Sequence, residues 1–266
     1  MLLVGIHLLQ GAAQAALFFP LIALPAQRRL KRRWSRRLLA RLGVRLAADE
    51  AALARCASGL LVCNHVSFID IFVINAVLPS GFVAKADVAG WPLIGWLCRR
   101  SETVFLARGN RRAAHQTQQR MVEQLLGGAR LAIFPEGTTT AGDRVLPFHG
   151  ALFQAAIDAA VPVHCLALRY QDRHGEHCLA PAYVGNTSLL DCLRGVLGEA
   201  GIEARLTLCA THPPPLPDRR HLAHQAHTDV TRGLRQLGQP TAHRPDAPTT
   251  GLGAMQPRCN AEATRP

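Results

Sequence analysis

From residue 59 onward, short apolar runs alternate with segments of helical periodicity, and this alternation restricts the fold more than any other feature of the chain. Strand-like runs occupy residues 60–63, 82–84, 103–106, 131–134 and 163–168, and a weaker one lies around 205–209. Helices are expected at about residues 67–78, 88–98, 111–127 and 149–159, with a polar helix around 219–237. Strands that alternate with helices are typical of an α/β fold, so we expect a mostly parallel sheet flanked by helices.

The amino terminus is apolar, and residues 2–26 contain no charged side chain. As a single helix they would reach roughly 37 Å, enough to cross the hydrocarbon layer of a membrane with some tilt. Pro20 and Pro25 instead favour a kink or an early end. The sequence therefore predicts a membrane-associated helix and leaves open whether it crosses the bilayer or lies in the interface.

A basic segment follows this helix. The first 48 residues hold nine basic residues and no acidic one. Among the basic residues an apolar side chain recurs at every fourth position: Leu30, Trp34, Leu38, Leu42 and Leu46. This spacing predicts an amphipathic helix that lies in a membrane interface with its arginines facing the anionic lipids of a bacterial inner membrane; the alternative is a solvated basic helix on a soluble protein, with the apolar run packed as an internal helix. The positive-inside tendency then places the rest of the chain in the cytoplasm. We expect residues 1–48 to form these two helices.

The rest of the chain has nearly balanced charge. The net charge is +12, but residues 49–266 carry 21 basic and 18 acidic side chains, so we expect no nucleic-acid partner. The eight cysteines are scattered without a C-x-x-C pair, which is typical of buried thiols in a reducing compartment. From Gly238 onward the chain is rich in Pro, Thr, Ala and Gly. We expect one domain over residues 49–238 and a disordered tail over residues 239–266.

Two of the expected strands end in loops that carry reactive side chains. The segment NHVSFID, residues 64–70, follows the first strand, and FPEGTTT, residues 134–140, ends the fourth. In a parallel sheet the carboxyl ends of the strands share one edge, where α/β folds place their ligands. These two loops are therefore the candidate site.

His65 and Asp70 can meet only in one local structure. Five residues along a continuous helix turn the side chain by about 500°, which would separate the two groups. They approach each other if His65 lies in the loop and Asp70 in the first turn of a helix capped by Ser67. A carboxylate on one imidazole nitrogen would then make the other nitrogen a proton acceptor. Alternatively, Asp70 only completes a capping box with Ser67, and His65 is an ordinary polar residue at a strand end.

The nucleophile is expected to come from the substrate. The chain has no G-x-S-x-G segment, and Cys63 ends an apolar strand, where we expect it to be buried. A His–Asp pair without its own nucleophile would activate a hydroxyl group of a substrate. This chemistry favours a transferase.

The two loops resemble motifs of the glycerolipid acyltransferases. NHVSFID resembles their NHx4D motif and FPEGTTT their FPEGT motif. Between them, Phe105-Leu106-Ala107-Arg108 resembles the block that holds a phosphate-binding arginine, and Val161-Pro162-Val163 resembles a short fourth block. The blocks stand in family order across residues 59–168 and resemble those of bacterial 1-acyl-sn-glycerol-3-phosphate acyltransferases.

This resemblance implies a reaction and a set of site residues. Residues 49–238 would move a fatty-acyl chain from acyl-carrier protein or coenzyme A to the sn-2 hydroxyl of lysophosphatidic acid, giving phosphatidic acid. His65 would be the base and Asp70 would orient it, without a metal or a cofactor. The expected substrate-binding residues are Arg108 and Lys85 for the phosphate and Glu136, Gly137 and Thr138 for the acceptor pocket. The Glu136 carboxylate could hold a glycerol hydroxyl or anchor its own loop.

One departure from the family pattern concerns the acceptor. Many members have Arg or Lys after FPEGT, whereas Thr139 and Thr140 follow here. The threonine version resembles acyltransferases of lyso-ornithine lipid and related lyso-lipids, whose acceptors need not carry phosphate. A lyso-ornithine lipid O-acyltransferase is therefore an alternative, and a non-catalytic adaptor that binds anionic lipid through the basic segment is a third hypothesis.

Overall fold

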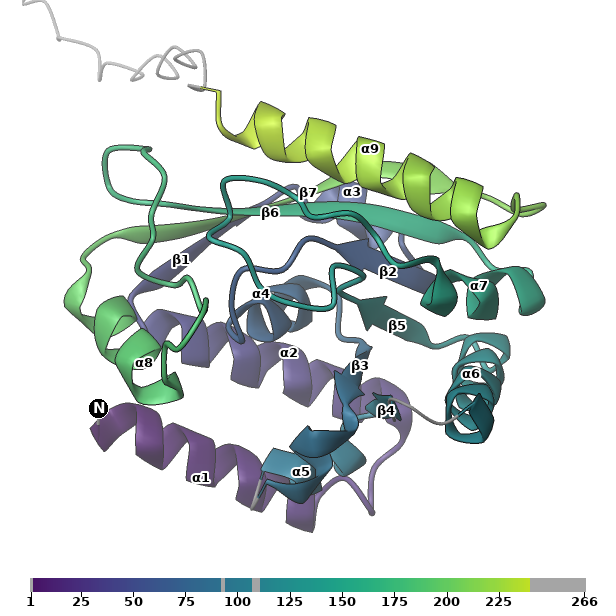
Figure 1. The fold of residues 1–266 in the computed structure, drawn as a ribbon. Helices are drawn as coiled ribbons and strands as arrows, with labels where there is room; N and C mark the ends of the chain where they lie inside the picture. Colours follow the sequence, from purple (N-terminus) through teal and green to yellow (C-terminus); the bar gives the residue numbers. More distant parts are fainter. Residues whose placement is uncertain (1, 92–93, 107–110, 240–266) are drawn as a thin grey trace, which may run out of the picture.

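The computed structural model describes residues 2–91, 94–106 and 111–239, and a seven-stranded sheet forms its centre (Figure 1). The strand order is β1-β7-β6-β2-β5-β3-β4, and all neighbouring strands are parallel except β6 and β7. The strands are β1 (Val44–Ala48), β2 (Gly59–Cys63), β3 (Gly81–Lys85), β4 (Val104–Leu106), β5 (Arg130–Ile133), β6 (Val163–Gln171) and β7 (Ile202–His212). The predicted α/β fold with a mostly parallel sheet is confirmed.

Helices cover both faces of the sheet (Figure 1). Leu61 and Cys63 of β2 belong to the core on the side of α2 and α4, whereas Leu60 and Val62 belong to the core on the side of α9. This division follows from the alternation of side chains along a strand, which explains why β2 is apolar throughout. The helical elements are α1 (Leu2–Leu17), α2 (Leu24–Arg41), α3 (Glu50–Ala54), α4 (Asp70–Val77), η1 (Ala86–Gly90), α5 (Ile94–Arg100), α6 (Arg111–Leu126), η2 (Gly150–Phe153), α7 (Gln154–Asp158), α8 (Leu189–Gly198) and α9 (Arg219–Leu237).

Three elements were not predicted. Strand β1 extends the sheet by pairing in parallel with β7, where Val44 stands opposite Ile202. The other two elements are short helices: α3 spans 5 residues and α8 spans 10. The expected helix over residues 149–159 is divided into η2 and α7. The predicted tail falls almost entirely on residues 240–266, outside the described residues.

The apolar amino terminus forms two helices rather than one. Helix α1 ends at Leu17, three residues before Pro20, and α2 begins at Leu24 with Pro25 in its first turn. Proline is tolerated in a first helical turn, whereas it disrupts a helix interior. No helix in the described part of the chain combines the length and the hydropathy that crossing a membrane requires.

The apolar stripe of the basic helix packs against the protein. Leu38 and Leu42 are each only 2% exposed and lie in the core that α4 also lines, so the expectation that this stripe faces a membrane is wrong. Leu46 is not on the helix at all, because α2 ends at Arg41 and Leu46 belongs to β1. Burying one leucine side chain contributes about 1.5–3 kcal/mol to the free energy of unfolding, so packing of this apolar face of α2 against the domain is favourable.

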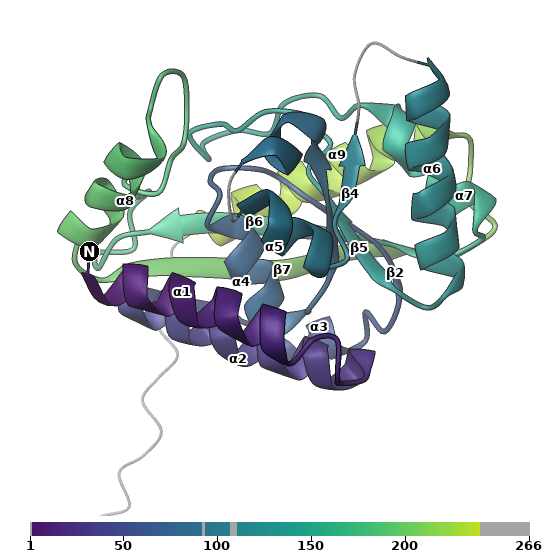
Figure 2. The ribbon, with the colours of Figure 1, turned by 90° about the horizontal axis from the view of Figure 1, so that it is seen from below.

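Helix α1 lies along α2 and forms the outer layer on this side (Figure 2). The His7 ring stacks on the Trp34 ring with centroids 5.0 Å apart, and the Trp34 indole N–H donates to the His7 carbonyl over 3.1 Å. A Cβ atom at Gly11 would come within 2.4 Å of the Trp34 ring. The aromatic contact between the two helices therefore depends on the missing side chain of Gly11.

Candidate active site

The carboxyl ends of four neighbouring parallel strands form the edge that carries the candidate site. His65 and Asp70 follow β2, Glu136 follows β5, and Lys85 is the last residue of β3. Lys85 is exposed there and stands opposite Leu106 of β4 in the sheet register. Arg108 follows β4 in the sequence but lies outside the described residues.

His65 and Asp70 meet in the local structure that the sequence requires. His65 lies in the loop after β2, Asp70 is the first residue of α4, and the His65 Nδ1 atom is 2.8 Å from an Asp70 carboxylate oxygen. The Asp70 side chain is fully buried, whereas the His65 side chain is 20% exposed. Among the described residues, none hydrogen-bonds the His65 Nε2 atom. The dyad thus presents one imidazole nitrogen as a proton acceptor.

The His65 ring is held on one face by Phe134, the first residue of the second loop. The two rings are stacked with centroids 4.0 Å apart and planes 9° apart. Phe134 also stacks on Phe82 of β3, which is buried. The imidazole orientation therefore depends on the second loop as well as on Asp70.

The Asp70 carboxylate accepts hydrogen bonds at both of its oxygens. Its Oδ2 atom accepts the backbone N–H groups of Val66 at 2.7 Å and Ser67 at 2.9 Å, in addition to His65. Its Oδ1 atom accepts the Tyr170 hydroxyl at 2.8 Å. Asp70 therefore orients His65 and also accepts the Ser67 N–H, but the predicted capping box with Ser67 is not formed, because the N-cap of α4 is Ile69. The Ser67 side chain is not a cap, and it lies 3.8 Å from the Cys192 sulfur.

Glu136 anchors the two loops to each other. One of its carboxylate oxygens accepts the His65 backbone N–H at 2.7 Å, and the other accepts the Leu146 N–H at 2.8 Å. Glu136 is 4% exposed, and burial raises the pKa of its carboxyl, although the two N–H groups oppose this shift. Because both oxygens are used, the geometry favours the loop anchor over the contact with a glycerol hydroxyl.

The residues after Glu136 shape the second loop. Gly137 has a φ of +71°, the left-handed conformation that glycine adopts without strain. Thr138 is exposed. The Thr139 hydroxyl donates to the Tyr183 carbonyl, and the Thr140 N–H donates to the His65 carbonyl at 2.8 Å. Thr139 and Thr140, which stand where many family members have Arg or Lys, therefore join this loop to the segments that hold Tyr183 and His65.

Asn64 and Cys63 have structural roles. The Asn64 carboxamide accepts the Leu168 N–H at 2.8 Å and donates to the Leu168 carbonyl at 2.9 Å, which fixes the start of the His65 loop to β6. Sequence reasoning missed this role, because the partner is 104 residues away. Cys63 is buried as predicted, and burial raises the pKa of its thiol well above the ordinary value. A thiol that remains protonated is a poor nucleophile.

One group in the described part of the chain has the donor types of a metal site. Donor atoms of Cys165, His212 and Asp229 lie within 4.8 Å of one another. However, the His212 Nε2 atom is already in direct contact with an Asp229 oxygen at 2.9 Å, and burial raises the pKa of the Cys165 thiol. This arrangement favours a polar link between β7 and α9. Asp229 therefore pairs with His212 of β7 as well as with Arg232 of its own helix.

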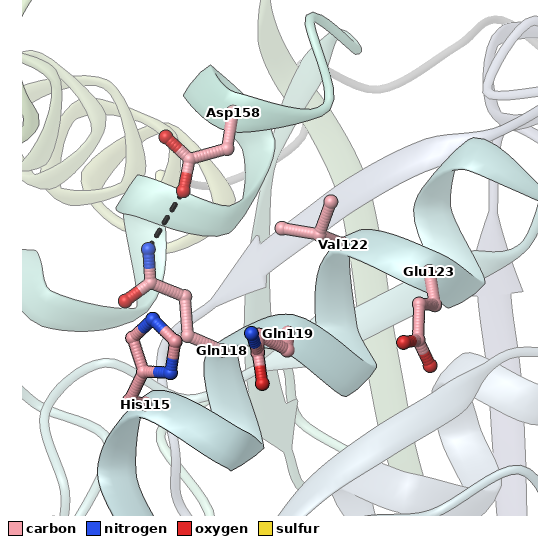
Figure 3. A pocket seen from close by; sticks show the side chains of 6 residues that line it. All are labelled: His115, Gln118, Gln119, Val122, Glu123 and Asp158. Carbon is pink, nitrogen blue, oxygen red and sulfur yellow. Dashed lines mark hydrogen bonds between the residues drawn. The ribbon is translucent and has the colours of Figure 1, made fainter. Parts of the chain in front are cut away.

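A separate surface depression lies between α6 and α7 (Figure 3). Apart from Val122 it is lined by polar side chains, and Gln118 donates to Asp158 across it at 2.7 Å. None of the predicted site residues lines it.

The chain is similar in sequence to known acyltransferases. The profile of the Acyltransferase family matches residues 48–169, which include both loops. A lyso-ornithine lipid O-acyltransferase of Pseudomonas aeruginosa is 38% identical over 83% of this chain and 84% of its own length. A 1-acyl-sn-glycerol-3-phosphate acyltransferase of Neisseria meningitidis is 35% identical over 69% of this chain and 72% of its own length.

A solved structure has the same fold. The 1-acyl-sn-glycerophosphate acyltransferase of Thermotoga maritima superposes with a TM-score of 0.66 over 91% of this chain and 98% of its own, at 18% sequence identity. At that identity the likeness concerns the fold. The sequence relatives and the His65–Asp70 geometry lead to one conclusion: the chain belongs to the Acyltransferase family and is an acyltransferase.

Proposed function

We propose that the protein moves a fatty-acyl chain from an acyl thioester to a hydroxyl group of lyso-ornithine lipid. The observation that carries this proposal is the identity of 38% with the Pseudomonas aeruginosa lyso-ornithine lipid O-acyltransferase, which extends over 83% of the chain. The second loop supports it, because Thr139 and Thr140, which stand where many family members have Arg or Lys, are engaged within the protein.

The dyad supplies the acid–base chemistry of this proposal. The His65 Nε2 atom removes the proton from the acceptor hydroxyl while Asp70 stabilises the imidazolium that forms. The alkoxide oxygen attacks the thioester carbonyl carbon, a C–O bond forms, and the C–S bond breaks. The departing thiolate of acyl-carrier protein or coenzyme A takes the proton back from His65. The electrons and protons balance without a further reactant.

Lysophosphatidic acid is the second candidate acceptor, and it is the one that the motifs alone favoured. Two observations support it. The Neisseria meningitidis relative, a 1-acyl-sn-glycerol-3-phosphate acyltransferase, is 35% identical over 69% of this chain. Lys85 is also exposed at the site edge, where it could contact a phosphate.

A panel of substrates separates these candidates. The purified protein is supplied with labelled acyl-carrier protein, or with labelled acyl-coenzyme A, and with either lyso-lipid. Product from lyso-ornithine lipid at the higher kcat/KM supports the first proposal. Product mainly from lysophosphatidic acid replaces it with the second, and product from neither acceptor with either donor contradicts both and favours the adaptor hypothesis.

We also propose that the protein acts at the cytoplasmic face of a membrane, with an apolar surface of α1, the turn after it and the start of α5 in the lipid interface. Helices α1 and α5 are in contact, and the large exposed apolar side chains of α1, the turn after it and the chain around the start of α5 are Leu2, Leu3, Ile6, Leu8, Leu9, Leu17, Phe18, Leu21, Trp91 and Ile94. An exposed apolar patch of this kind is typical of an interaction site.

The charges of α2 support the same orientation. One set of cations faces the domain, where Arg28 and Lys31 pair with Glu102 and Arg36 pairs with Glu50. A second set is exposed at every fourth position and can face anionic lipid: Arg29, Arg33, Arg37 and Arg41.

Flotation with lipid vesicles tests the location. Wild type is expected to float with vesicles of phosphatidylcholine and phosphatidylglycerol, and Leu9→Glu combined with Leu21→Glu is expected to remain in solution. Leu126→Glu on α6 is the matched control, because Leu126 is an equally exposed leucine outside the patch. Equal flotation of all three proteins would contradict the proposed surface.

A further inference from the structure

A buried tyrosine points its hydroxyl at the carboxylate behind the proposed base. Tyr170 lies on β6 and is 1% exposed. Its hydroxyl donates to the Asp70 Oδ1 atom over 2.8 Å. We propose that Tyr170 is a positioning residue, which holds the Asp70 carboxylate and limits how strongly that carboxylate stabilises the His65 imidazolium. This inference rests on the proposed role of His65 as the base.

The two oxygens of Asp70 are held in different ways. The Oδ2 atom accepts His65 and two backbone N–H groups, whereas among the described residues only the Tyr170 hydroxyl bonds the Oδ1 atom. Tyr170 is therefore placed to fix the rotation of the carboxylate about its terminal bond. Tyr170 stands opposite Ala204 of β7 in the sheet register, and its carbonyl accepts the Cys178 N–H at 3.1 Å.

The phenol remains a donor over the working pH range. Burial raises the pKa of Tyr170 well above its ordinary value, and the negative charge of Asp70 raises it further. The other titratable groups around the carboxylate are Cys63 on β2, Cys192 on α8 and Glu136 in the second loop. Burial raises the pKa of both thiols, so they are neutral neighbours.

Removal of the hydroxyl has two expected consequences. Without the Tyr170 hydroxyl, the negative charge of the Asp70 carboxylate interacts more strongly with its remaining donors, including His65. The His65 imidazole therefore stays protonated to higher pH. The carboxylate also loses the donor that holds its Oδ1 atom, and with it part of its rotational restraint, so kcat falls. Tyr170 contacts Asp70 rather than the exposed side of His65, so the KM for the acceptor should change little.

The test compares Tyr170→Phe with Ser80→Ala. Ser80 is fully buried and its hydroxyl donates to the Leu78 carbonyl, but it lies just before β3, at the opposite edge of the sheet. In Tyr170→Phe we expect kcat to fall roughly tenfold. We also expect the midpoint of the His65 imidazole titration, followed by NMR with labelled histidine, to rise by about half a pH unit. Ser80→Ala should show neither change.

A second substitution acts in the opposite direction without removing the side chain. Fluorotyrosine is a stronger hydrogen-bond donor than tyrosine, and in a Tyr183→Phe background it labels Tyr170 alone, because the chain has two tyrosines. The titration midpoint should then move to lower pH.

Each outcome decides a separate question. A folded Tyr170→Phe protein with an unchanged midpoint and unchanged kcat overturns the inference. If Tyr170→Phe does not fold, an unchanged midpoint in the fluorinated protein overturns it. The NMR titration needs no substrate, so a wild type without acyl-transfer activity would contradict the proposed function while the role of Tyr170 is still measured.

Discussion

Replacement of Glu136 by glutamine tests whether this carboxylate holds the site together or binds the acceptor. In the structure its two oxygens accept the N–H groups of His65 and Leu146 at 2.7 and 2.8 Å. Glutamine keeps one carbonyl oxygen and presents an NH2 group where the other oxygen was. One buried N–H would then face a donor instead of an acceptor.

The expected loss of stability follows from these two bonds. A hydrogen bond to a charged group contributes roughly 1.5–3 kcal/mol, and an unsatisfied buried donor costs about 1–3 kcal/mol. Glutamine also avoids burying a charge, which offsets part of the loss. We expect the free energy of unfolding to fall by about 2 kcal/mol near pH 7, which corresponds to a decrease in Tm of about 4–8 °C for a domain of this size.

Urea denaturation and steady-state kinetics together measure this effect. Glu123→Gln on α6 is the matched control, because Glu123 is exposed and the change there should stay within about 0.5 kcal/mol. For Glu136→Gln we expect lower stability and lower kcat, with the KM for the acceptor nearly unchanged. If its stability equals that of wild type while the acceptor KM rises, then Glu136 is an acceptor contact and the anchor is refuted.

Three further predictions follow from the same structure. Cys63→Ala should retain acyl transfer, and Cys63 in the folded protein should not react with iodoacetamide, since burial raises the pKa of its thiol; rapid inactivation by the reagent at Cys63 would contradict this. Gly11→Leu should force α1 away from Trp34, cost about 1–3 kcal/mol and expose the turn after α1 to proteolysis; wild-type resistance would be the opposite result. Burial raises the Glu136 pKa above its ordinary 4.5, so ionising this buried carboxyl costs wild type part of its stability as pH rises from 4.5 through the raised pKa, and the two hydrogen bonds supply the contribution that is left near pH 7. Urea titrations at several pH values should therefore show wild type losing stability relative to Glu136→Gln as pH rises above 4.5.

Local sequence patterns were sufficient to predict the central strands of the sheet and the way His65 and Asp70 meet. The apolar runs that became β2, β5 and β6 are too short and too apolar to be surface helices, and their parallel order places the two loops at one edge. His65 and Asp70 are five residues apart, so the turn geometry of the chain alone restricts how they can meet. These parts of the structure depend on neighbours in the sequence.

Partners that are distant in the sequence could not be predicted. Nothing near residue 170 indicates that the Tyr170 hydroxyl bonds Asp70, 100 residues earlier. The same limit explains the error on α2. A periodic apolar stripe indicates that one face of a helix is buried. The same stripe is found whether that face contacts lipid or, as for Leu38, a protein core. Glu136 also had two open roles until the positions of the His65 and Leu146 N–H groups were known.

The central claim is that His65 at the sheet edge removes the proton from a lyso-lipid hydroxyl. The most direct test measures single-turnover acyl transfer to lyso-ornithine lipid by wild type and by His65→Ala, with circular dichroism to verify that both proteins are folded. General base catalysis contributes typically 10²–10⁴-fold, so His65→Ala should slow the transfer by about that factor. A folded His65→Ala protein that transfers the acyl chain at the wild-type rate would contradict the account.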